Sequence, residues 1–286
     1  MTFLVAGTNH LFAQTSAESW SSVATANFRV WATDGKTARL VADECERQRR
    51  ELRDYWQGRP LNATTAPATA TWSPERWSSP CDVVVHPTAL AFQKAVGPGS
   101  ERSFGSSYWR VVGGKVTARR IDLRADERDP RTAALPHELT HMILADRMGA
   151  KPMPRWLDEG IAVQADVREK RLGHQRDWER SLANRRVFRF QELTTFENYP
   201  VAEQIPLFYG QSAALVRELL ERGTPAQLLE FAELTRDFGC ETAARRVYAI
   251  ADAKSWETDW LAAERRRVEA TLSTNNSHDE RLVMAK

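Results

Sequence analysis

The chain has 286 residues, of which 42% are hydrophobic and 27% are charged, an ordinary composition for a globular protein with a buried core. Its 40 basic and 38 acidic side chains leave a formal charge of +2, so the overall charge does not indicate a nucleic-acid-binding protein. No stretch approaches the roughly 20 consecutive apolar residues of a membrane-spanning helix. We therefore expect no nucleic-acid partner and no transmembrane segment, and the oligomeric state stays open.

Two arginine-rich runs and three cysteines stand out from this composition. The runs are Arg47–Arg50 and Arg265–Arg267, and glutamates flank both of them, which favours solvated helix faces over nucleic-acid patches. The cysteines are Cys45, Cys81 and Cys240. An odd number cannot pair completely within one chain, and the absence of a C-x-x-C spacing argues against a cysteine metal site or a dithiol redox site.

The N-terminal segment, residues 1–26, is expected to be a signal remnant or disordered. Met1–Ala13 is mildly apolar but lacks a positively charged start, and polar residues interrupt its apolar run. A secretory signal has an unbroken apolar region after a basic one. The match is partial, but the apolar character of the segment still slightly favours export, to a periplasm or the exterior, over a cytoplasmic location.

Strand patterns dominate the next hundred residues. Alternation and β-branched residues predict strands, and glycine or proline clusters predict turns. The expected elements are a strand at 27–31, a helix at 36–56, a loop at 61–80, a strand at 81–86, a short helix at 87–96, and a hairpin of 109–112 and 115–123 joined by two glycines. The second arm breaks its alternation at Arg119 and Arg120, which predicts a bulge or an exposed edge strand.

Helical periodicity dominates from residue 131 onward. The expected helices are 133–148, 155–169, 206–221, 225–236, 241–250 and 255–271. Strands followed by helices predict an α+β protein, in which a single domain over 27–271 combines a lobe with a mixed or antiparallel sheet (27–130) and a mostly helical lobe (131–271). Residues 272–286 are polar and are expected to form a flexible tail.

The first helix of the second lobe carries the most informative motif, His137-Glu138-Leu139-Thr140-His141. Residues four apart on a helix share a face, so both imidazoles can reach one metal ion. Glu138 follows the first histidine and can accept a proton from a water on that ion. A chance H-E-x-x-H on an ordinary helix is the alternative.

A catalytic zinc site normally has a third protein ligand and one position for water. After a short connection, Pro154 can begin a second helix that packs against the first. Glu159 on this helix would then face the histidines, whereas the competing Asp158 points about 100° away. A surface acid near a helix start is the alternative for Glu159.

Taken together, H-E-L-T-H followed by W-L-D-E-G-I-A resembles the gluzincin zinc peptidases, the group of thermolysin and the zinc aminopeptidases. The specific motifs cover residues 133–211, and residues 27–124 match by element order alone. The resemblance implies one Zn²⁺ per chain held by His137, His141 and Glu159. The G-x-M-E-N motif of the aminopeptidases is absent, which favours endopeptidase action.

Two further residues become candidates. The resemblance implies that Tyr209, in a Y-x-x-S-A context, donates a hydrogen bond to the oxyanion; a half-buried tyrosine at a helix start is the alternative. Asp166 lies about two helical turns beyond Glu159. It is a candidate acceptor for the N–H of a ligand histidine, or else a solvated acid.

The expected function is a zinc-dependent peptidase that acts on a peptide or protein substrate, with Glu138 as general base and general acid. The arm that ends at Leu123 is a further candidate, for pairing with the extended backbone of the substrate. Two other classes remain open: a catalytically inactive zinc-containing binding or assembly domain of the same fold, and a metal-free helical interaction protein with a coincidental motif.

Overall fold

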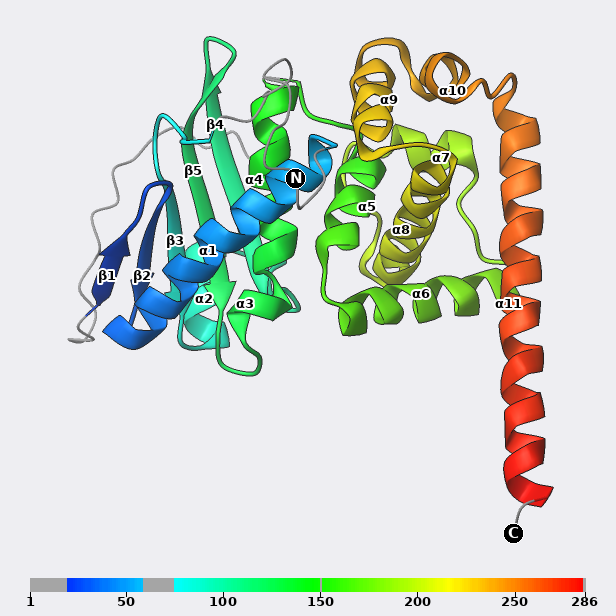
Figure 1. Ribbon diagram of the computed structural model, residues 1–286, viewed down its shortest axis with the longest axis horizontal. Helices are drawn as coiled ribbons and strands as arrows, with labels where there is room; N and C mark the ends of the chain where they lie inside the picture. Colours follow the sequence, from blue (N-terminus) through cyan, green and yellow to red (C-terminus); the bar gives the residue numbers. More distant parts are fainter. Residues whose placement is uncertain (1–19, 59–74, 150, 285–286) are drawn as a thin grey trace. The chain divides into compact units, whose positions relative to one another are not determined.

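The computed structural model describes residues 20–58, 75–149 and 151–284. The chain divides into two compact units, one of residues 1–153 and 161–171 and the other of residues 154–160 and 172–286. Met1–Ala13 and most of the expected loop at 61–80 lie outside the described residues. The expected α+β class is confirmed, because a mixed sheet near the N-terminus is followed by helices (Figure 1).

The first unit contains a five-stranded sheet with the order β1-β2-β3-β5-β4. Its strands are β1 (Ser21–Ala24), β2 (Phe28–Ala32), β3 (Cys81–His86), β4 (Gly105–Val112) and β5 (Lys115–Arg124). The three central strands run parallel, and β1 and β4 pair antiparallel with their neighbours. Strand β4 therefore forms one edge of the sheet as the structure describes it.

The helices of this unit are α1 (Gly35–Trp56), α2 (Ala89–Val96), α3 (Pro130–Ala133) and α4 (Leu135–Met148). Alternate residues of β3, among them Val83 and Val85, share one core with Val41 of α1 and with Leu139 and Met142 of α4. Because side chains alternate across a strand, this core lies on one face of the sheet, between the strands and these two helices (Figure 1).

The interrupted alternation in β5 comes from a bulge, as expected, together with a buried charge. Strand β5 lies between β3 and β4, so an exposed edge strand at Arg119 and Arg120 is wrong. The bulge comes two residues earlier, where the pairing with β4 skips Thr117. Arg119 is buried, forms an ion pair with Asp146 and lies over the ring of Trp77. The bulge turns Arg119 inward, and its partnered charge then interrupts the apolar pattern.

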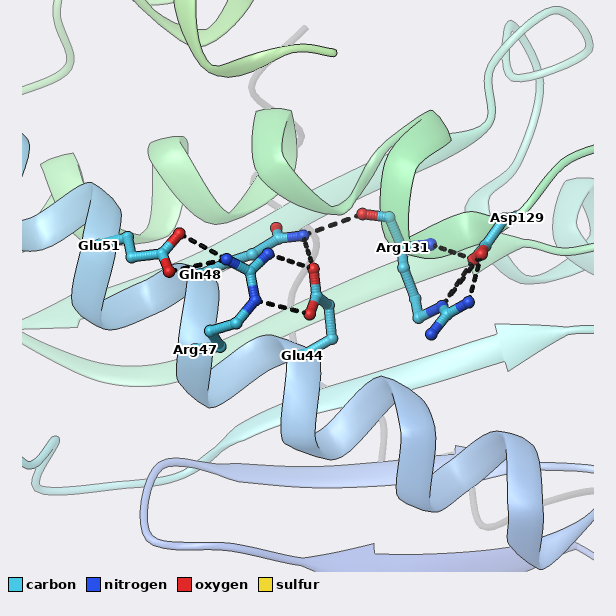
Figure 2. Close-up of polar contacts among 6 residues, drawn as sticks. All are labelled: Glu44, Arg47, Gln48, Glu51, Asp129 and Arg131. Atoms are coloured by element: carbon cyan, nitrogen blue, oxygen red, sulfur yellow. Dashed lines mark hydrogen bonds and ion pairs between the residues drawn. The ribbon is translucent and has the colours of Figure 1, made fainter.

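The first arginine-rich run only partly forms a solvated helix face. Arg47 is half-exposed and donates hydrogen bonds to Glu44 and Glu51, one helical turn away on either side (Figure 2). Arg49 is buried, with its guanidinium 4.2 Å from the ring centre of Trp77, so the expectation is wrong for this residue. Burial lowers the pKa of Arg49 to about 10.

Gln48 connects this charged face to the segment that precedes α4. Its side-chain nitrogen donates to Glu44 at 2.6 Å and to the carbonyl of Arg131 at 3.0 Å (Figure 2). Asp129 caps the short helix α3 by accepting from the backbone N–H of Arg131 at 2.9 Å. Hydrogen bonds from α1 and from a helix cap thus fix the chain just before the H-E-x-x-H helix.

Helices make up the rest of the chain. They are α5 (Arg155–Ala165), α6 (Arg168–Ala183), α7 (Phe190–Thr195), a 3₁₀ turn η1 (Ala202–Gln204), α8 (Ile205–Arg222), α9 (Pro225–Phe238), α10 (Cys240–Tyr248) and α11 (Ala253–Met284). The expected helix at 155–169 ends at Ala165 instead, and α11 runs beyond Thr271 to Met284. Strand β1 and helices α3, α6 and α7 were not expected.

Aromatic side chains hold the second unit together. The rings of Trp178 and Trp260 stack at 5.2 Å, and Glu264 accepts a hydrogen bond from the indole N–H of Trp178 at 2.7 Å. Arg217 on α8 pairs with the same carboxylate at 2.8 Å. Helices α6, α8 and α11 therefore meet at one buried acid. No helix among the described residues is long and apolar enough to cross a membrane.

Candidate metal centre

Helix α4 is buried along almost its whole length, and it packs against α1, β4 and β5 within the first unit. Ala134 breaks the helical path just before it, with φ −143° and ψ −31°, so the helix begins at Leu135 rather than at 133. Pro136 then falls in the first turn, where its missing N–H costs no hydrogen bond. This start explains how a proline can directly precede His137.

The two histidines lie on one face of α4, as their spacing predicts. Their ring centres are 5.0 Å apart with the planes at 75°, and both side chains are buried. Two imidazoles this close on one helix face can each offer a ring nitrogen to the same ion. The pair therefore suits a common cation.

Glu159 joins this pair. One ligand atom from each of His137, His141 and Glu159 lies within 4.8 Å of the other two, and all three residues are buried. It is the one such group of histidine, cysteine and acidic side chains found among the described residues. Two imidazoles and one carboxylate form the ligand set of several catalytic zinc sites, so the residues present fit this metal.

Asp166 holds the first histidine. Its carboxylate accepts from Nδ1 of His137 at 3.2 Å and from Nζ of Lys170 at 2.9 Å, and its side chain is fully buried. Burial alone would raise the pKa of Asp166, but the hydrogen bond and charge of His137 and the charge of Lys170 keep this pKa below its usual value. The expected hydrogen bond from a histidine N–H to Asp166 is confirmed, and a solvated acid is wrong.

This hydrogen bond also selects the histidine tautomer. When Nδ1–H donates to a carboxylate, Nε2 carries the lone pair that can bind a metal. Asp166 follows the last residue of α5, so the end of that helix places the carboxylate beside His137.

Glu138 is buried beside the first residue of the edge strand β4. A Cβ atom at Gly105 would lie 2.8 Å from Cγ and 2.9 Å from Oε1 of Glu138, and 2.6 Å from Cβ of Ala134. Only a residue without a side chain permits such an approach. The strand therefore begins against the carboxylate that is the candidate general base.

The glycine after Glu159 has a comparable packing role in the second unit. A Cβ atom at Gly160 would lie 2.6 Å from the carbonyl oxygen of Ser212 and 2.7 Å from a methyl group of Val216. Helix α8 therefore approaches α5 closely at this residue. The contact fixes the helical turn that carries Glu159.

Tyr199 is a site residue that the sequence analysis missed. Its hydroxyl donates a hydrogen bond to Oε1 of Glu159, and the guanidinium of Arg155 lies 4.9 Å from its ring centre. Burial and the negative charge of Glu159 raise the pKa of Tyr199, against smaller opposing effects of Arg155 and Tyr209. The hydroxyl therefore stays protonated and remains a donor.

Tyr209, the tyrosine singled out in the sequence, lies next to Tyr199. Its ring stacks on that of Tyr199 at 6.3 Å and on that of His174 at 5.4 Å. Its role in oxyanion binding remains a prediction. No motif spacing connects Tyr199 to the H-E-x-x-H helix, because it lies between two short helices, α7 and η1, far along the chain.

No protein-family model matches the chain, and no curated protein matches it significantly. The functional interpretation therefore depends on the residues of the site itself.

Proposed function

We propose that this protein is a zinc-dependent peptidase, an endopeptidase whose site resembles that of the gluzincins. The observation that carries the proposal is the buried group of His137, His141 and Glu159, with ligand atoms within 4.8 Å of one another. Glu138 directly follows the first histidine. This combination of three ligands and an adjacent carboxylate is the arrangement that metal-assisted amide hydrolysis requires.

His137, His141 and Glu159 would hold the metal. A zinc ion bound there would lower the pKa of a coordinated water toward about 7 and polarise the scissile carbonyl. Glu138 accepts the proton of the attacking water and then donates it to the leaving nitrogen, acting first as base and then as acid. Tyr209 is the proposed donor to the oxyanion.

The edge strand β4 is the better candidate for substrate pairing. The arm that ends at Leu123 is β5, which already pairs on both sides, with β3 and β4. Strand β4 pairs with β5 alone among the described strands, and it begins beside Glu138. A peptide that adds to β4 as an extended strand would therefore pass the proposed general base.

Substitution of the base tests the reaction. Glu138→Gln keeps the size of the side chain but cannot accept a proton, so we expect hydrolysis of a peptide library to fall by about 10²–10⁴-fold. Zinc content, measured by elemental analysis, should stay at about one ion per chain, because Glu138 is not a ligand. His141→Ala is the matched variant, which should lose both zinc and turnover.

The same measurements distinguish a peptidase from a zinc-containing binding domain and from a metal-free protein. A wild-type protein that binds zinc but cleaves no peptide would be a zinc-containing binding or assembly domain. Wild-type protein without bound zinc, and with no uptake of added Zn²⁺, would contradict the metal site itself. Turnover that Glu138→Gln leaves unchanged would contradict the assignment of the base.

A further inference from the structure

Two side chains of the second unit converge on a single oxygen of Glu159. The hydroxyl of Tyr199 donates to Oε1, and Nη1 of Arg155 lies 3.8 Å from the same atom. Arg155 is one helical turn before Glu159 on α5, whereas Tyr199 is forty residues further along the chain. A carboxylate with 2% exposure thus receives a hydroxyl donor from a distant segment.

A stack of planar groups fixes the position of this hydroxyl. The Arg155 guanidinium covers one end at 4.9 Å from the Tyr199 ring, and the rings of Tyr209 and His174 follow with interplanar angles of 20° and 21°. Phe208 also meets the Tyr199 ring edge-on, at 6.0 Å. Residues of α5, α6 and α8 therefore hold the ring of Tyr199 in place, although Tyr199 itself lies in the loop between α7 and η1.

The hydroxyl donor of Tyr199 is important because the carboxylate of a glutamate rotates easily about its last side-chain bond. The last torsion of a glutamate side chain joins an sp³ carbon to an sp² carbon, and its preferred angles are broad. A hydrogen bond to one oxygen restricts that rotation and decides which lone pairs point toward a metal. The Arg155 contact is too long for a hydrogen bond, so this side chain contributes charge and covers the tyrosine ring.

We propose that Tyr199 is the positioning residue of Glu159, and that its hydroxyl holds the carboxylate in the orientation that binds zinc. This inference rests on the proposed function, because it assumes that His137, His141 and Glu159 share a zinc ion. Tyr199 acts through Glu159, so its effect falls first on metal binding. Partners of metal ligands typically change metal affinity by about 10–100-fold when they are removed.

The test compares Zn²⁺ affinities by competition with a chromophoric chelator. Tyr199→Phe keeps the ring and its stacking but removes the hydroxyl, so we expect the affinity to fall by about 10–100-fold. Tyr248→Phe is the matched control, because it removes another buried hydroxyl of the same unit that has no hydrogen-bond partner. Its Zn²⁺ affinity should equal that of the wild type.

A second measurement separates positioning from folding. Co²⁺ replaces zinc in such sites, and its visible absorption depends on the ligand geometry. The Tyr199→Phe protein should show a changed Co²⁺ spectrum while its metal-free form still unfolds cooperatively. Unchanged affinity and an unchanged spectrum would overturn the role of Tyr199 while leaving the zinc site intact. Wild-type protein that binds neither ion would overturn the zinc site and the positioning role together.

Discussion

Asp166 illustrates how a single buried carboxylate can accept hydrogen bonds from two donors. It accepts from His137 on one oxygen and from Lys170 on the other, so its negative charge is compensated although water is excluded from its side chain. A charged acceptor makes the imidazole a stronger metal ligand than a neutral acceptor does. The residue therefore adjusts the first histidine without touching a metal.

Asp166→Asn tests this adjustment, because the amide keeps one acceptor oxygen and loses the charge. We expect Zn²⁺ affinity to fall by about 10–100-fold, measured by chelator competition. Glu169→Gln removes the same charge three residues away, at an exposed position, and should leave the affinity unchanged. Equal losses in both variants would mean that general electrostatics, rather than the bond to His137, sets the affinity.

At the scale of elements, segments with a strong apolar period were predictable, and short or polar segments were not. Helix α6 was missed although it has 16 residues, because only Trp178 and Leu182 of them are buried. Helix α1 and strand β3 have strong patterns, and they occur where the sequence places them. Strand β1 has only four residues, Ser21–Ala24, with no alternation of large apolar side chains. Helix α7 has six residues, two of which are threonines, which favour helix weakly.

The candidate site was predictable to the extent that its residues are close in sequence. The i, i+4 rule places His137 and His141 on one face, and the short link to α5 makes Glu159 a natural third candidate. Tyr199 comes from a separate segment, and nothing local marks it. Arg119 was misinterpreted because its counter-charge, Asp146, lies on another element, so the tertiary structure determines its burial.

Close helix packing at Gly160 leads to a prediction about stability. Gly160→Ala would push a methyl group against the backbone of Ser212, and we expect a loss of about 1–3 kcal/mol in the free energy of unfolding. Gly173 is the matched control on α6, since a Cβ atom there would meet nothing within 4 Å. Gly173→Ala should stabilise the protein by about 0.5–1 kcal/mol, because alanine favours helix.

Urea unfolding of the two variants checks this pair. The midpoint should move down for Gly160→Ala and up for Gly173→Ala, at an unchanged slope. An equal loss of stability in both variants would contradict the prediction, because it would mean that the close contact at Gly160 has no effect of its own.

At the scale of the whole molecule, each unit has its own means of stabilisation. The first unit has a sheet with a continuous apolar core on one face, and the second unit has stacked tryptophans around Glu264. Neither core includes the proposed metal ligands. Without a metal, the buried imidazoles and carboxylate of the site carry a cost of desolvation, which a bound cation would offset.

Zinc should therefore stabilise the folded chain through mass action. Free Zn²⁺ at 100 times its dissociation constant would add about 2.7 kcal/mol, and each kcal/mol raises the melting temperature of a domain of 150–250 residues by about 2–4 °C. Thermal unfolding with Zn²⁺ and with a chelator measures the difference. His141→Ala removes one ligand, so its melting temperature should be the same in both conditions. An equal shift in His141→Ala and wild type would place the stabilising ion elsewhere, because a site without one of its two imidazoles cannot retain the full affinity.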